Sequence, residues 1–164
     1  MLHREKGFTL LELMVALTVL AILLGIGVPS FNSFVESSRL RSAVHEINSA
    51  VYLARSEAVT RRQDAAACRA NTTNTACDFG NDWSQGWLVV LLNGADLETA
   101  ADVDVVRIWD EVEVTASGAI NGFVFDRLGA ADAAVSLDIQ NDTDNRCISV
   151  NISGRVLVQE QACP

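Results

Sequence analysis

The stretch Gly7-Phe8-Thr9-Leu10-Leu11-Glu12 opens an apolar run that extends to Val28 and organises the rest of this chain. The 21 residues from Phe8 to Val28 carry one charge, that of Glu12. A helix of that length covers about 31 Å, which is enough to cross the hydrocarbon core of a bilayer.

The segment ahead of the apolar run differs from a secretory signal peptide. Residues 1–7 carry Arg4 and Lys6, and basic residues before an apolar run are typical of its cytoplasmic side. A secretory signal has its small-residue cleavage site after the apolar run. The sharp small-residue boundary in this chain is Gly7-Phe8, which lies in front of the run.

This arrangement, Lys6-Gly7-Phe8-Thr9-Leu10-Leu11-Glu12-Leu13, resembles the class III signal of type IV pilins and of the pseudopilins of type II secretion. The resemblance implies that a prepilin peptidase cleaves the leader, residues 1–7, after Gly7 and that Phe8 becomes N-methylated. Residues 8–29 would then remain as a transmembrane and assembly helix. A lone carboxylate in such a helix is costly. Glu12 is therefore expected to pair with the amine of Phe8 on a neighbouring subunit and to set the axial register. The alternative is an ordinary single-pass anchor that tolerates Glu12.

Pro29 stands at the outer end of the apolar run, where proline predicts a kink or local melting of the helix. A plain helix end is the alternative, but helical periodicity resumes at once and favours a kink. Apolar residues at spacings of three and four predict an amphipathic helix over residues 30–62, with its apolar stripe on a sheet. The stripe consists of Phe31, Phe34, Val35, Leu40, Val44, Ile47, Val51, Ala54 and Ala58.

Residues 63–164 are expected to form a loop followed by a β-rich head. The small, polar segment from Gln63 to Ser84 is typical of a connecting loop. Runs rich in β-branched residues follow, separated by turn pairs such as Ser117-Gly118 and Ser153-Gly154. The predicted strands cover residues 87–92, 103–109, 111–115, 122–126, 134–139, 147–152 and 155–159. The sequence thus predicts an α+β fold in which an antiparallel sheet packs on the outer half of one long helix. The tryptophans Trp83 and Trp87 are expected to serve core and strand packing.

The four cysteines, Cys68, Cys77, Cys147 and Cys163, all follow the apolar run. If that run delivers the head outside the cytoplasm, disulfides are expected. Four cysteines allow three pairings, among which sequence alone cannot choose. We favour the short-range pairs Cys68–Cys77 and Cys147–Cys163. A zinc site is disfavoured because no Cys-x-x-Cys motif exists and no histidine lies near any cysteine.

The charge of the chain is strongly acidic. The net charge is −9, and loss of residues 1–7 would make it −10. Residues 70–164 carry 15 Asp and Glu against four Arg. Such a head repels phosphate polymers, so nucleic acid is not expected as a partner.

The residues that catalysis needs are largely missing. There is no Gly-rich phosphate loop, and His45 is the single histidine after residue 7, which excludes most Ser-His or Cys-His arrangements. Asp138, Asp142 and Asp144 form a loose acidic cluster. The stretch Asp142-Thr143-Asp144-Asn145 lacks the central Gly and closing Glu of a calcium loop. We therefore expect no enzyme activity, no cofactor and no metal site.

Further stretches resemble minor pilins of the FimT/FimU class, which shares its domain with pseudopilin H. They are Val28-Pro29-Ser30-Phe31, Arg39-Leu40, Leu53-Ala54-Arg55-Ser56-Glu57-Ala58-Val59, Trp83-Ser84-Gln85-Gly86-Trp87, Phe123-Val124-Phe125-Asp126-Arg127-Leu128-Gly129 and Cys147-Ile148-Ser149-Val150-Asn151-Ile152-Ser153-Gly154-Arg155.

This resemblance implies a type IV pilin-like fold and a minor pilin that primes assembly of type IV pili. Its implied partners are other minor and major pilins, the prepilin peptidase, and the inner membrane with its pilus assembly platform. The head would lie in the periplasm before assembly and in the pilus at the cell surface afterwards, serving adhesion, twitching motility or DNA uptake. One alternative is the type II secretion pseudopilin H, against which Pro29 argues. The other is a DNA-binding receptor at the pilus tip, against which the acidic charge argues.

Overall fold

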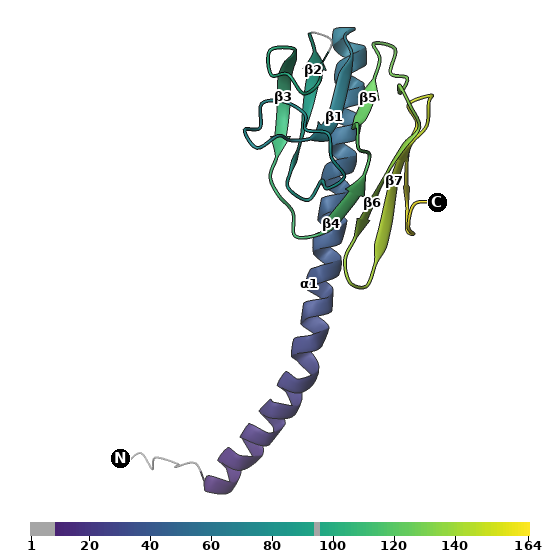
Figure 1. Cartoon of the computed structure of the whole chain (residues 1–164). Helices are drawn as coiled ribbons and strands as arrows, with labels where there is room; N and C mark the ends of the chain where they lie inside the picture. Colours follow the sequence, from purple (N-terminus) through teal and green to yellow (C-terminus); the bar gives the residue numbers. More distant parts are fainter. Residues whose placement is uncertain (1–8, 94–95) are drawn as a thin grey trace, which may run out of the picture. The chain divides into compact units, whose positions relative to one another are not determined.

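The computed structural model describes residues 9–93 and 96–164 and separates into two compact units, the first ending at Glu36 and the second being Ser37–Pro164. The helix α1, Leu10–Arg61, contributes to both units. The strands of the described residues belong to the second unit (Figure 1). The second unit is called the head below.

The helix is unbroken at Pro29, so neither a helix end nor a melted segment occurs there. The kink stays a prediction. Among the described residues, no helical segment combines the length and the apolar character needed to cross a membrane. The bilayer crossing of residues 8–29 therefore also stays a prediction.

The apolar stripe of the amphipathic helix becomes buried only from Leu40 onward. Ile47, Val51, Ala54 and Ala58 are fully buried, as predicted, and so are alanines that the stripe did not include. Phe31 and Phe34, which are 65% and 67% exposed, belong to the first unit, so the packing of these turns on a sheet stays a prediction. Within the head, the helical periodicity therefore identified the face of α1 that packs on the sheets.

The first sheet has the order β3-β2-β1-β5 and is antiparallel throughout. Its strands are β1 (Ala65–Arg69), β2 (Trp87–Leu92), β3 (Val103–Trp109) and β5 (Phe123–Phe125). Strands β2 and β3 have the predicted bounds.

Strand β1 corrects the prediction that residues 63–84 form a connecting loop. It lies inside the first sheet, where Ala65 pairs with Leu91 of β2 on one side and with Phe125 of β5 on the other. The segment was missed because alanine has low β propensity and no side chain that indicates a strand. Small side chains suit this position, because the strand is packed on both faces and Ala65, Ala66 and Ala67 are fully buried.

The second sheet has the order β4-β6-β7-β8 and is also antiparallel. Its strands are β4 (Thr115–Gly118), β6 (Val135–Gln140), β7 (Asn145–Val150) and β8 (Val156–Gln159). The head thus contains two sheets where one was expected. The strand predicted at 111–115 is wrong, since β4 begins at Thr115 and includes the pair Ser117-Gly118 that was assigned to a turn.

One large core joins the helix to both sheets. It contains Leu40, Ile47 and Val51 of α1, aromatic residues beside and within the first sheet, and Leu137, Ile139 and Ile148 of the second sheet. Trp83 and Trp87 are fully buried in it, and Trp83 packs edge-on against Phe123. The core packing predicted for both tryptophans is confirmed. A smaller core covers the opposite face of the first sheet, so β2 is buried on both faces and shows no alternation.

Two loops of the head, the one between β5 and β6 and the one between β7 and β8, make a close backbone contact beside α1. The turn before β8 places Gly154 with φ +74°, and a Cβ atom added there would lie 2.0 Å from the carbonyl oxygen of Gly129. That carbonyl accepts a hydrogen bond of 3.0 Å from Nε of Arg55 on α1. Gly129 also has a positive φ of 81°. Gly154 lies in the predicted turn pair Ser153-Gly154. Glycine is needed there for the close approach to Gly129 as well as for the turn geometry.

Candidate functional site

The N-terminal motif is described only from Thr9 onward. Gly7 and Phe8, the predicted cleavage and methylation positions, lie outside the described residues. Thr9 precedes the first residue of α1, and its Oγ1 accepts a hydrogen bond of 3.2 Å from the backbone N–H of Glu12. The backbone N–H of Leu13 also donates to the carbonyl of Thr9, at 3.2 Å. Thr9 is therefore the N-cap of the helix.

Thr9 is a site residue that the sequence analysis missed, although a signal for it existed. Thr9-Leu10-Leu11-Glu12 has the Thr-x-x-Glu spacing of a capping box, in which the first residue caps the third residue of the helix. Glu12 lies in the first turn, where a carboxylate interacts favourably with the positive end of the helix dipole. Its side chain is exposed. The pairing of Glu12 with an amine of another subunit stays a prediction.

The helix that Thr9 opens is apolar on all of its sides. Every large apolar side chain from Leu10 to Leu24 is at least half exposed, from 50% at Val19 to 76% at Leu10. No single face of this segment is buried in the way that the face from Leu40 onward is buried in the head. An apolar surface of this kind is suited to contact with lipid or with other apolar helices rather than with water.

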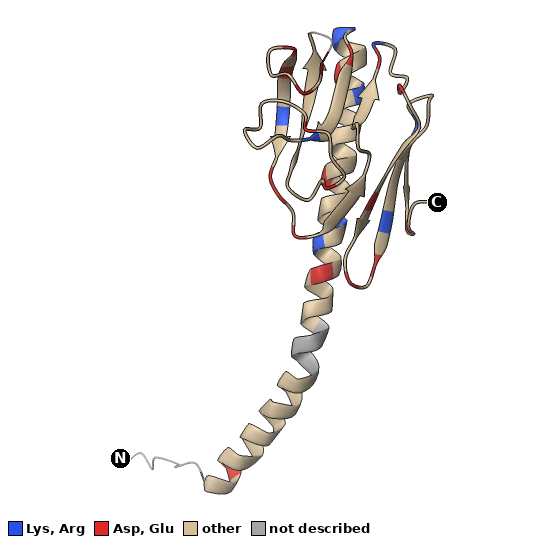
Figure 2. Cartoon of the chain, viewed as in Figure 1, with Lys and Arg blue, Asp and Glu red and all other residues tan. Residues whose placement is uncertain are grey.

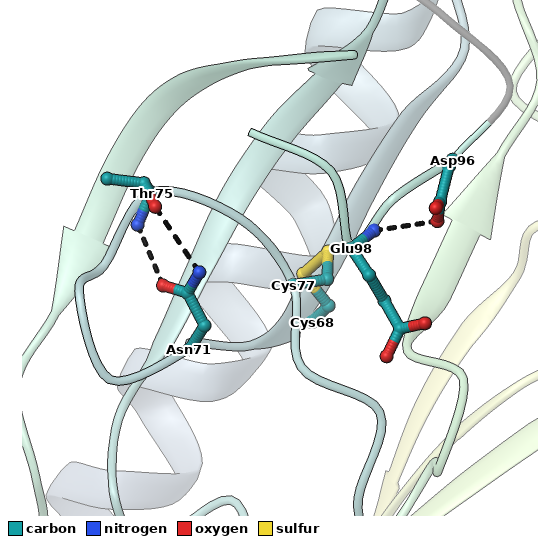
Figure 3. Close-up of a disulfide and its surroundings, with 6 residues drawn as sticks. All are labelled: Cys68, Asn71, Thr75, Cys77, Asp96 and Glu98. Carbon is teal, nitrogen blue, oxygen red and sulfur yellow. Dashed lines mark hydrogen bonds between the residues drawn. A yellow bond between two sulfur atoms is a disulfide. The ribbon is translucent and has the colours of Figure 1, made fainter. Parts of the chain in front are cut away.

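The two predicted disulfides are confirmed. Cys68 of β1 is bonded to Cys77, which closes the loop that follows β1 (Figure 3). Within that loop, the Asn71 side chain donates to Thr75 Oγ1 at 3.2 Å and accepts from the Thr75 backbone N–H at 2.9 Å (Figure 3). The loop is thus tied down at its base and across its turn.

The second disulfide joins Cys147 of β7 to Cys163 near the C-terminus. The backbone N–H of Cys163 also donates to Asp138 on β6, at 2.7 Å. The segment after β8 is therefore fixed to the second sheet at two points.

The three aspartates that the sequence grouped, Asp138, Asp142 and Asp144, lie on β6 and in the turn between β6 and β7. Asp138 accepts the bond from Cys163, and the backbone N–H of Asp144 donates to the Asn141 side chain at 2.7 Å in the turn between β6 and β7. Among the residues that the structure describes, no three carboxylate, histidine or cysteine side chains converge as metal ligands would.

Acidic side chains outnumber basic ones across the head, and the basic ones are scattered over several elements (Figure 2). Some of the arginines are engaged within the fold. Arg69 forms an ion pair of 2.7 Å with Asp78, and Arg39 forms one with Glu113. Arg107 lies over the ring of Trp109, 4.7 Å from its centre. His45 is exposed on α1.

Comparison with known proteins places these features in a family. Residues 43–154 match the family described as type II transport protein GspH, and residues 2–28 match the prokaryotic N-terminal methylation motif. Among curated proteins, none matches the chain significantly.

Two crystal structures of the type IV minor pilin FimU from Pseudomonas aeruginosa share the fold. The one in space group P21 superposes with a TM-score of 0.59 at 22% identity, over 77% of this chain and 92% of the FimU chain. The one in space group P65 gives a TM-score of 0.56 at 21% identity, over 73% and 91% respectively. The chain therefore belongs to the GspH family, the domain family of the FimT/FimU class of minor pilins, and it carries a type IV pilin fold behind an N-terminal methylation motif.

Proposed function

We propose that this chain is a minor subunit of type IV pili that primes pilus assembly and is then incorporated into the filament. The observation that carries this proposal is the apolar helix from Leu10 to Leu24, whose large side chains are all at least half exposed. Exposing apolar area to water costs about 25 cal/mol per Å². Such a helix is stable only when lipid or other apolar helices cover it, and a filament built from pilin helices supplies that cover.

Before assembly, the proposed cover is the inner membrane. Residues 8–29 would anchor the chain there after cleavage behind Gly7, with the head in the periplasm. The two disulfides support this location, because disulfides form and persist in oxidising compartments such as the periplasm. The head itself is proposed to act through contacts rather than catalysis, in keeping with its single histidine, the exposed His45.

Glu12 is proposed to be the residue that selects the position of the subunit in the filament. The cap formed by Thr9 holds the first turn of α1, and the Glu12 carboxylate projects from that turn. In a filament core from which water is excluded, this charge needs a cationic partner, and the amine of a neighbouring Phe8 is the candidate. Removing one member of a buried pair costs about 3–5 kcal/mol, because the other charge is left uncompensated.

The test is complementation of a deletion of this gene in the source organism. The wild-type gene should restore pili, and Glu12→Gln, which keeps the size but removes the charge, should reduce the number of pili at least about tenfold. Met14→Leu, a swap of similar volume on the same apolar helix, is the matched control and should restore pili fully. Normal piliation by Glu12→Gln would refute the pairing. Immunoblots of the membrane fraction should give equal amounts of all three proteins.

Membership of the GspH family favours a second candidate function, that of a type II secretion pseudopilin. The deletion strain distinguishes the two functions directly. Loss of pili with normal export of type II substrates supports the minor pilin. Loss of export with normal pili would support the pseudopilin and overturn the first proposal.

A further inference from the structure

A hollow of about 320 Å³ lies in the head between the helix and the second sheet. On one side it is lined by Arg41, Val44, His45 and Asn48, whose spacings of three, four and seven place them on one face of α1. Arg146 of β7, Val158 of β8 and Glu160 form the other side. Arg41 and Arg146 thus line one hollow of a head whose charge is otherwise strongly acidic.

Among the described residues of this hollow, Arg146 has one counterion, the exposed carboxylate of Glu160. The Arg146 side chain is only 16% exposed, and its Nη1 donates one hydrogen bond, of 2.9 Å, to the backbone carbonyl of Asn145. Its Nη2 forms an ion pair of 3.6 Å with Glu160, which is longer than a hydrogen bond, and the Glu160 side chain is 86% exposed. A guanidinium has five N–H donors. A largely desolvated cation with unused donors favours an anion that accepts hydrogen bonds.

The hollow also offers an acceptor and apolar walls. The Oδ1 atom of Asn48 is buried and has no hydrogen-bond partner. A buried acceptor without a partner is unfavourable by about 1–3 kcal/mol, and an N–H donor from a ligand would remove that cost. Val44 and Val158 provide apolar contact beside these polar groups. A peptide with an acidic side chain matches these groups. The arginines would bind its carboxylate, the amide oxygen of Asn48 would accept one of its N–H groups, and the valines would contact its apolar atoms.

We propose that this hollow, lined by Arg41, Asn48 and Arg146, is a docking site for an acidic peptide segment of another protein. The Arg146 and Arg41 guanidiniums bind the carboxylate, and Asn48 accepts an N–H of the peptide. A phosphate polymer is a poorer occupant, because its phosphodiester backbone has no N–H group to donate to the buried Oδ1 of Asn48. The proposal is independent of whether the chain serves a pilus or a secretion system.

The test uses the full, ¹⁵N-labelled chain in detergent micelles and two synthetic peptides. Acetyl-Asp-Glu-Asp-amide should cause saturable NMR shifts of the Asn48 side-chain amide and of the Arg146 Nε–H, whereas acetyl-Asn-Gln-Asn-amide should cause none. Arg41→Gln and Arg146→Gln should each weaken binding by about tenfold or more. Arg41 is exposed, so its substitution leaves the fold unaffected even if Arg146→Gln destabilises it.

Arg107→Gln is the matched control, because Arg107 lies on β3 in the other sheet, and it should leave binding unchanged. Equal binding of the neutral peptide would overturn the proposal, and so would unchanged affinity in both variants of the hollow. If oligothymidylate moves the same resonances at lower concentration than the acidic peptide, the hollow binds nucleic acid and the peptide assignment is wrong.

Discussion

Gly154→Ala is expected to destabilise the head strongly, although it adds a single methyl group. An alanine at φ +74° costs about 1–2 kcal/mol relative to glycine. The added Cβ would lie 2.0 Å from the carbonyl oxygen of Gly129, so that backbone has to move. Movement of this carbonyl breaks its bond with Arg55, and hydrogen bonds to charged groups contribute about 1.5–3 kcal/mol. The expected loss is therefore about 3–5 kcal/mol.

Thermal unfolding of the oxidised full chain in detergent micelles measures this loss. The near-ultraviolet circular dichroism of the buried Trp83 and Trp87 reports on the head. At about 2–4 °C per kcal/mol, Gly154→Ala should lower the melting temperature by about 6–20 °C.

Arg55→Ala is the control that separates the hydrogen bond from the steric clash. It removes the donor and adds no atoms, so it should cost less than Gly154→Ala. The double variant should lose less than the sum of the two, because both substitutions break the same bond. A melting temperature of Gly154→Ala within about 2 °C of the wild type would refute the reasoning, and strict additivity would show that the bond does not link the two sites.

Three further predictions concern processing, covalent stability and charge. Intact-mass analysis of membrane-extracted protein should give a chain that begins at N-methylated Phe8, because the small residue Gly7 directly precedes the apolar run; retention of Met1 would exclude the class III signal. Replacing Cys147 and Cys163 by serine should lower the free energy of unfolding by about 3 kcal/mol, as expected for a bridge spanning 16 residues; urea unfolding measures this, and an unchanged midpoint would contradict it. The chain in micelles should not bind duplex DNA at low ionic strength, given its net charge of −9; an anisotropy titration with micromolar affinity that falls steeply with salt would reverse that conclusion and support the DNA-uptake function.

The sequence by itself determined the parts of this protein that depend on local pattern. Three features can be recognised within a short stretch of sequence. They are the helical periodicity from Leu40 to Ala58, the bounds of β2 and β3, and the pilin-type motif. The short-range disulfides were favoured from the sequence, but only the structure chose them among the three possible pairings. The cap formed by Thr9 was equally local and could have been predicted from its spacing to Glu12.

Tertiary structure alone decided the remaining features. Alanines 65–67 form a central strand because they pair with strands on both sides and are buried between two cores, and no local propensity expresses these contacts. The division into two sheets follows from long-range pairing of β4 with β6. The hollow between Arg41 and Arg146 exists because β7 and β8 pack beside α1. Contacts between residues far apart in the chain depend on the packing of whole elements, which a pattern of neighbouring residues does not contain.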